Sequence, residues 1–158
     1  MDDDIRYAEE MYKEHILDLY KNPLNFGPHE ATHIKRGFNP LCGDDITLYL
    51  TLKDGVIQKA TFTGKACAIC TAATSLITDK VTSMTHDDAR SLTKEDVLAM
   101  LHIPISTVRM KCALLPLDTV HSALEGEEGY ATTEEHNQKI NESNNKANTK
   151  TNNNTGGI

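Results

Sequence analysis

Residues 46–63 contain two extended segments joined by a tight turn, and this stretch most limits what the chain can fold into. Apolar residues alternate with polar ones before the turn, at Ile46, Leu48, Leu50 and Leu52. The turn is Asp54-Gly55, a pair typical of two-residue β-hairpins, and Val56 to Thr63 follows as the partner strand. The pattern predicts an antiparallel hairpin with one buried face, ended by Gly64.

Helical periodicity precedes the hairpin. Apolar residues recur at spacings of three and four and predict an amphipathic helix that Asn22-Pro23 ends; they are Ile5, Ala8, Tyr12, Ile16 and Leu19. The segment from Glu30 to Phe38 is expected to add a third strand.

Three more helices are expected after the hairpin. The first begins at Ala68, and the second begins at Thr93, where an acidic first turn suits the helix dipole. The last begins near Cys112, which keeps Pro116 in its first turn, and Gly126 stops it. The predicted fold class is α+β, with a small antiparallel sheet of about three strands packed against helices.

The composition predicts one folded domain at residues 1–126 and a tail at residues 127–158. Eight of the residues from Asn137 to Ile158 are asparagine, and such a segment buries too little apolar area to offset its ordering entropy. We therefore expect a polar, disordered tail.

The formal net charge of −7 comes without a basic stripe, which argues against nucleic-acid binding. No apolar run reaches the length of a membrane helix, and the first residues do not resemble a secretory signal. We therefore expect no membrane association and a cytoplasmic protein, in which four cysteines indicate metal or sulfur chemistry more than disulfides.

Three cysteines lie at junctions between the expected elements. Cys42 precedes the hairpin, Cys67 lies between the hairpin and the next helix, and Cys112 opens the last helix. Element ends can bring distant sequence positions into one exposed site. Asp44, two residues after Cys42, adds a hard ligand to a soft one. A helix start at Cys67 and the bases Arg109 and Lys111 beside Cys112 are expected to favour thiolates.

Cys70 forms a Cys-x-x-Cys pair with Cys67, and three interpretations are open. The pair can be a redox motif of thioredoxin type, although that motif belongs in a parallel βαβ setting. Cys70 can be a further ligand that completes a four-cysteine zinc site. It can also be a small buried residue in the first turn of the helix, which is the interpretation we favour.

Several of these residues together resemble the IscU/SufU/NifU N-terminal family of iron–sulfur cluster assembly proteins. They are Asn22-Pro23-Leu24-Asn25-Phe26-Gly27, Asn39-Pro40-Leu41-Cys42-Gly43-Asp44, Cys67, the small residues from Thr71 to Ser75, and Arg109-Met110-Lys111-Cys112. The resemblance covers roughly Ile5 to Gly126.

The resemblance implies that Cys42, Cys67 and Cys112 bind a transient [2Fe–2S] cluster, iron or zinc, with Asp44 as a further ligand. It also implies that a cysteine desulfurase delivers persulfide sulfur to one of these cysteines. The finished cluster then passes to apo iron–sulfur proteins, so the protein is a scaffold and carrier, not a conventional enzyme.

The sequence departs from the family at three points. Lys111 stands where IscU proteins have histidine, as in SufU, yet the span from Cys67 to Cys112 lacks the SufU insertion. The stretch from Ile105 to Arg109 stands where IscU proteins have the motif Leu-Pro-Pro-Val-Lys, which a dedicated Hsp70 chaperone recognises. We therefore do not expect that chaperone as a partner. A cluster scaffold is the first hypothesis, a SufU-like zinc-dependent sulfurtransferase the second, and a structural zinc module the third.

Overall fold

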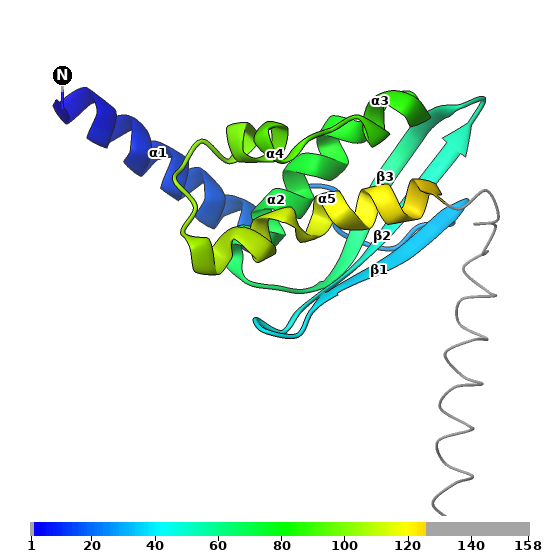
Figure 1. Cartoon of the computed structure of the whole chain (residues 1–158), viewed down its shortest axis with the longest axis horizontal. Coiled ribbons are helices and arrows are strands. Elements are labelled where there is room, and N and C mark those ends of the chain that lie inside the picture. The colour runs from blue at the N-terminus through cyan, green and yellow to red at the C-terminus, as the bar shows by residue number, and fades with distance from the viewer. Residues whose placement is uncertain (1, 126–158) are drawn as a thin grey trace, which may run out of the picture.

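A computed structural model of the chain describes residues 2–125. Its strands are β1 (His33–Asn39), β2 (Asp44–Lys53) and β3 (Val56–Lys65). Its helices are α1 (Asp2–Lys21), α2 (Ala68–Val81), α3 (His86–Arg90), α4 (Lys94–Leu101), the single turn η1 (Thr107–Arg109) and α5 (Met110–Glu125) (Figure 1). The predicted α+β fold is confirmed. The tail predicted at residues 127–158 lies outside the described residues.

The three strands form one antiparallel sheet in the order β1-β2-β3. Asp54 and Gly55 both have positive φ, at 53° and 75°, as a two-residue hairpin turn of the favoured type requires. The prediction that Gly64 ends β3 is wrong, because Gly64 pairs with Ile46 and the strand continues to Lys65. A Cβ on Gly64 would collide with the backbone of Asp45, so glycine permits this close pairing.

Helices α2 and α5 pack on the sheet and on each other, and α1 packs on α2 (Figure 1). Apolar side chains of the sheet, α2 and α5 turn into this shared core, as the patterns predicted. The prediction for α1 is only partly confirmed, because Ile16 and Leu19 are buried whereas Ile5 and Tyr12 of the same predicted face are exposed. Fully or almost fully buried core residues include Ile16, Leu19, Leu48, Leu50, Phe62, Ile77, Val81 and Val120. None of the helices within residues 2–125 has the length and apolarity needed to span a membrane.

The expected start of α5 is wrong by a short distance. The helix begins at Met110 after the turn η1, so Pro116 lies inside it and not in its first turn. Proline has no N–H to donate to the carbonyl group four residues earlier, which here belongs to Cys112. The ladder of α5 is therefore interrupted beside this cysteine.

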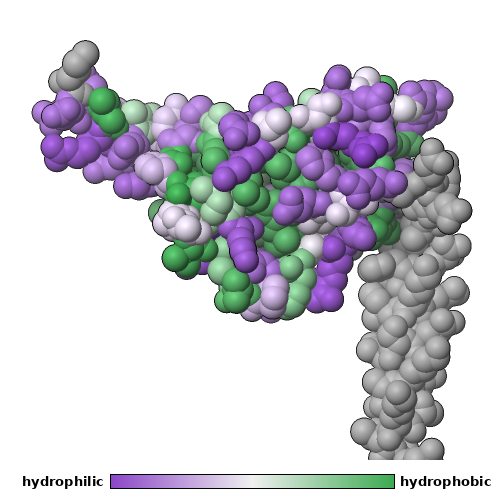
Figure 2. Space-filling view, in the orientation of Figure 1, coloured by the Kyte–Doolittle hydropathy of each residue, from purple (hydrophilic) through white to green (hydrophobic). Residues whose placement is uncertain are grey.

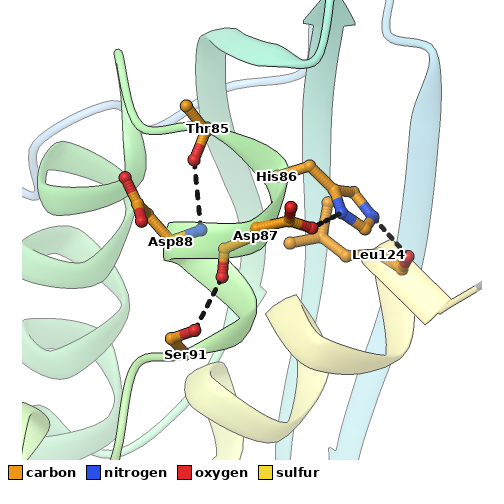
Figure 3. A network of polar contacts seen from close by, with 6 residues as sticks. All are labelled: Thr85, His86, Asp87, Asp88, Ser91 and Leu124. Carbon is orange, nitrogen blue, oxygen red and sulfur yellow. Dashed lines mark hydrogen bonds and ion pairs between the residues drawn. The ribbon is translucent and has the colours of Figure 1, made fainter.

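Two shorter helices connect α2 to α5. The predicted helix start at Thr93 is confirmed, and Thr93 and Asp96 form a reciprocal capping box there. Helix α3 was not predicted; the Thr85 hydroxyl caps it by accepting a hydrogen bond from the Asp88 N–H (Figure 3). His86 Nε2 lies 2.8 Å from the Leu124 carbonyl oxygen, which joins α3 to the end of α5 (Figure 3).

Candidate metal and sulfur site

The loop between β1 and β2 carries Cys42 and Asp44. Gly43 between them has a φ of 71°, and its N–H donates to the Asn39 carbonyl oxygen at 2.9 Å, which closes a tight turn. Glycine adopts this left-handed conformation without a Cβ penalty. The turn leaves Cys42 exposed at the tip and places Asp44 in the buried first position of β2.

Cys67 caps the start of α2. Its backbone is extended, and its Sγ accepts a hydrogen bond from the Cys70 N–H at 3.4 Å. Its own N–H donates to Asp44 Oδ1 at 2.8 Å. These two contacts satisfy backbone donors near the helix start and tie α2 to the first residue of β2.

Helix α5 supplies Cys112. The helix lies close against β1 at Gly37, where a Cβ would collide with Thr119 Oγ1, so the absence of a side chain permits the approach. Cys112 is fully buried, and its Sγ lies 3.2 Å from Cys42 Sγ. The amide nitrogen of the Asn39 side chain lies 3.9 Å from the Cys112 sulfur.

The structure brings three of the four predicted ligands into one group. One ligand atom each from Cys42, Asp44 and Cys112 lies within 4.8 Å of the others. Cys67 is outside that group but packs against the small apolar cluster that contains Cys112. The three junction cysteines and Asp44 therefore share one region, with Cys67 at its edge.

Asp44 has one satisfied and one unsatisfied carboxylate oxygen. Oδ1 accepts the Cys67 N–H, whereas Oδ2 is buried and has no hydrogen-bond partner. An unpaired buried acceptor costs about 1–3 kcal/mol, and more when it is charged. A cation held between Asp44, Cys42 and Cys112 would remove this cost.

Burial is greater than the sequence suggested. We expected an exposed site, but only Cys42 is exposed, while Cys67 is half-buried and Cys112 and Asp44 are buried. Burial raises the pKa of the Cys112 thiol, and the neighbouring Asp44 and Cys42 side chains raise that pKa further. These effects disfavour the thiolate that was expected at Cys112, and we expect metal binding there to release a proton.

The two bases before Cys112 differ in their position. The cysteine side chains, Cys112 first and then Cys67, raise the pKa of Arg109, so this cation lies near the sulfur atoms. Lys111 is exposed, and Arg109 is the base whose pKa responds to the cysteines. Of the two bases, Arg109 is the one that can stabilise charge on the cysteines.

Cys70 lies beneath the site. It is fully buried in the first turn of α2, as the favoured interpretation expected, and it packs in one cluster with Cys112 and Ile46, against which Cys67 also packs. Burial, followed by the charge of Asp44, raises the pKa of Cys70. The strand before α2 belongs to an antiparallel hairpin, so the βαβ setting of a thioredoxin motif is absent from residues 2–125.

Asn39 is a site residue that the sequence reasoning did not single out for a role. Its side-chain oxygen accepts the Leu41 N–H at 3.2 Å, and its amide nitrogen points to the Cys112 sulfur. The side chain is buried although it is polar. An asparagine directly before proline at the start of a cysteine loop was the available signal, because such side chains often bond to nearby backbone.

Large apolar side chains are exposed around the site. Leu41 is 77 % exposed beside Cys42, and Val108 is 78 % exposed in η1, just before α5. Figure 2 shows hydrophobic surface among hydrophilic patches along the lower edge of the molecule, where Figure 1 places the loop between β1 and β2 and the segment that leads into α5. Exposed apolar residues that gather beside a reactive group are typical of protein–protein contact surfaces.

Comparison with known proteins agrees with this arrangement. The model of the NifU-like N terminal domain matches residues 11–134. The chain is 35 % identical over 132 residues to the iron–sulfur cluster assembly scaffold protein IscU of Thermotoga maritima, covering 72 % of this chain and 92 % of the relative. It is 28 % identical over 136 residues to the zinc-dependent sulfurtransferase SufU of Bacillus subtilis, covering 75 % and 92 %.

A solved structure shows the same fold. The crystal structure described as a putative iron–sulfur cluster assembly scaffold protein for the SUF system, from Fervidobacterium islandicum AW-1, aligns with a TM-score of 0.60 at 25 % identity. The alignment covers 74 % of this chain and 98 % of that structure. The chain thus belongs to the IscU/SufU/NifU family of proteins with a NifU-like N-terminal domain, as its cysteine motifs indicated.

Proposed function

We propose that this protein is an iron–sulfur cluster assembly scaffold. It holds iron and sulfide on Cys42, Cys67 and Cys112 with Asp44, and it then passes the cluster to apo-proteins. The observation that carries the proposal is the meeting of Cys42, Asp44 and Cys112 within 4.8 Å, although Cys112 on α5 lies 70 positions after Cys42 in the sequence. In this role the protein is a carrier and not a conventional enzyme.

The chemistry of the donors supports a transient cargo. Thiolates suit iron and zinc, and the carboxylate is a harder ligand that exchanges more readily than a fourth thiolate. Cys42 is exposed at the loop tip, so one side of the site remains open for ligand exchange with a receiving protein. The unpaired Oδ2 of Asp44 supports a cation at the buried side. A [2Fe–2S] cluster is the cargo we propose.

A second candidate is a zinc-dependent sulfurtransferase like SufU. The observation that favours it is Lys111, which stands directly before Cys112, where IscU proteins have histidine, and is exposed. The ligand group found within residues 2–125 accordingly contains no histidine. In this alternative zinc occupies the same donors, and Cys42, Cys67 or Cys112 accepts persulfide sulfur. The relative from Bacillus subtilis carries this function in its name.

Both candidates require the same kind of sulfur donor. A cysteine desulfurase is the partner we propose, and the exposed Leu41 and Val108 offer it an apolar contact beside the cysteines. Apo iron–sulfur proteins are the proposed recipients for the scaffold. We propose no dedicated Hsp70 chaperone, because Ile105 to Arg109 does not match its recognition motif in IscU.

Anaerobic reconstitution with ferrous iron and sulfide tests the scaffold. We expect a visible [2Fe–2S] spectrum that single replacements of Cys42, Cys67 or Cys112 by serine abolish or strongly reduce. Ser75→Ala is the matched control, because Ser75 is a small buried residue of α2 away from the ligand group. Absence of a spectrum, under conditions that load an established scaffold, would reject the proposal.

Metal analysis of anaerobically purified protein separates the two candidates. Stoichiometric zinc, together with stimulation of a cysteine desulfurase that the cysteine replacements remove, would favour the sulfurtransferase. Iron with acid-labile sulfide in matching amounts would favour the scaffold.

A further inference from the structure

Cys70 is a buried thiol for which neither candidate function provides a role. It is fully buried and lies outside the group of Cys42, Asp44 and Cys112 that can share a metal. It nevertheless packs in the same cluster as Cys112, and Cys67 packs against that cluster. A thiol that solvent cannot reach, but that lies among the cysteines of the site, can react only with what those cysteines carry.

The geometry of Cys67 directs it toward Cys70. Cys67 is the N-cap of α2, and its extended backbone turns its side chain back over the first helical turn. There its Sγ accepts the hydrogen bond from the Cys70 N–H at 3.4 Å. In the Cys-x-x-Cys pair at this helix start, Cys67 is half-buried and Cys70 is fully buried, an arrangement that supports disulfide formation between the two.

We propose that Cys70 is a resolving thiol that releases sulfide from a persulfide on Cys67. The inference rests on the proposed function, because the sulfur must arrive as a persulfide. The Cys70 sulfur attacks Sγ of Cys67, the bond between Sγ and the outer sulfur breaks, and a Cys67–Cys70 disulfide forms. The outer sulfur leaves with the electron pair of the broken bond and takes the Cys70 proton, so the persulfide anion and one thiol become one disulfide and one HS⁻.

This step converts sulfane sulfur to the sulfide that a cluster contains. The outer sulfur is reduced by two electrons, and the Cys67–Cys70 dithiol is oxidised to a disulfide. Two equivalents of a thiol reductant then reduce the Cys67–Cys70 disulfide to two thiols, and the reductant is itself oxidised to its disulfide. The reaction consumes neither Cys42 nor Cys112, so the group of Cys42, Asp44 and Cys112 stays intact to receive iron, and Cys67 becomes available as a ligand again when the disulfide is reduced.

Cys42 and Cys112 are the competing pair, since their sulfur atoms lie 3.2 Å apart. A disulfide between them would also release sulfide from a persulfide on either residue. It would, however, remove two of the three grouped ligand atoms at the moment when sulfide becomes available. A Cys67–Cys70 disulfide occupies only one proposed ligand, Cys67, and leaves the three grouped ligand atoms free.

A single-turnover experiment tests the proposal with the full-length chain. A cysteine desulfurase is loaded with one ³⁵S persulfide, freed of L-cysteine by gel filtration and mixed anaerobically with the protein without a thiol reductant. Monobromobimane traps released sulfide, and peptide mass spectrometry after alkylation locates persulfides and disulfides. We expect ³⁵S-sulfide and a Cys67–Cys70 disulfide in equal amounts. Cys70→Ser should retain the label as a Cys67 persulfide, whereas Ser75→Ala should behave as the wild type.

Each other outcome contradicts the proposal in its own way. A stable Cys67 persulfide in the wild type, without sulfide, overturns the resolving role and leaves sulfur acceptance standing. Sulfide release together with a Cys42–Cys112 disulfide would show that Cys42 and Cys112, and not Cys70, carry out the release. Absence of label on the protein and in the sulfide trap rejects sulfur acceptance itself, and the inference with it. The disulfide is located in the wild type, so the test does not depend on the folding of the variant.

Discussion

The carboxylate of Asp44 accepts the backbone N–H of Cys67 at 2.8 Å and leaves its second oxygen buried without a partner. One oxygen therefore holds the start of α2 against β2, while the other is free for a cation. The side chain has a structural task and a proposed ligand task at once, and the two can be separated by substitution.

Asp44→Asn should preserve the hydrogen bond from Cys67 and remove the negative charge. We expect zinc affinity, measured by competition with a chromogenic chelator, to fall by about tenfold or more, since even indirect partners of metal ligands contribute that much. Asp45→Asn is the matched control, because Asp45 instead pairs with Arg36 at 2.7 Å. Wild-type zinc affinity in Asp44→Asn would contradict a ligand role for the carboxylate.

Arg109→Gln should slow alkylation of the site cysteines in the metal-free protein. The guanidinium faces Cys112, Cys67 and Cys42, so its removal disfavours the thiolates that react with iodoacetamide. Time-resolved mass spectrometry at neutral pH measures the effect, which we expect to be a few-fold decrease in rate. Lys111→Gln removes the same charge from an exposed side chain and should have a smaller effect. Equal alkylation rates in Arg109→Gln and Lys111→Gln would contradict the prediction, because they would show that the cysteines respond to the net charge and not to the position of Arg109.

Gly37→Ala should destabilise the domain by about 1–3 kcal/mol, the usual cost of overpacking. The new Cβ would collide with Thr119 Oγ1 and push α5, and with it Cys112, away from β1. Urea denaturation of the metal-free protein measures the free energy of unfolding. Thr119→Ala in the same chain removes the colliding oxygen and should restore part of the loss. Additive effects of the two substitutions would contradict this contact as the cause.

Acidification should destabilise the domain partly through His29. Its ring nitrogens lie 2.6 Å from Thr61 Oγ1 and 2.9 Å from Thr51 Oγ1, and burial, followed by the charge of Lys59, lowers the pKa of His29 below 6.5. A lowered pKa in the folded state means that the unfolded chain binds the proton more readily. This contribution to stability is therefore complete above about pH 6.5 and is lost as the pH falls toward the folded-state pKa.

The same measurement in His29→Gln checks this assignment. Urea denaturation between pH 7.5 and pH 5.5 should show a shallower decrease of the unfolding free energy in His29→Gln than in the wild type. His33, whose pKa is also lowered by burial, remains in both proteins and accounts for part of the residual slope. His15→Gln is the control, because His15 is exposed on α1. An unchanged slope in His29→Gln would contradict the prediction.

Much of the fold follows from the sequence alone, because it depends on short-range rules. The buried Ile46, Leu48 and Leu50 of β2, the Asp54-Gly55 turn and the helix start at Thr93 are each read within a few residues, and the structure confirms them. The alternation along β2 is incomplete, because Tyr49 between Leu48 and Leu50 is buried as well. Pro116 and Gly64 are where this reasoning was wrong. Packing of α5 on the sheet holds Pro116 inside a helix, and close pairing with Ile46 keeps Gly64 inside a strand.

The sequence determined which residues carry the chemistry, since cysteines at element ends and the motif around Cys42 are visible in one dimension. Only the tertiary structure decided which of them meet and how much water reaches them. Cys42 and Cys112 are seventy positions apart, and their contact depends on the approach of α5 to β1 at Gly37. The burial of Cys112, the unpaired oxygen of Asp44 and the position of Cys70 beneath the site follow from that packing, which no local pattern encodes.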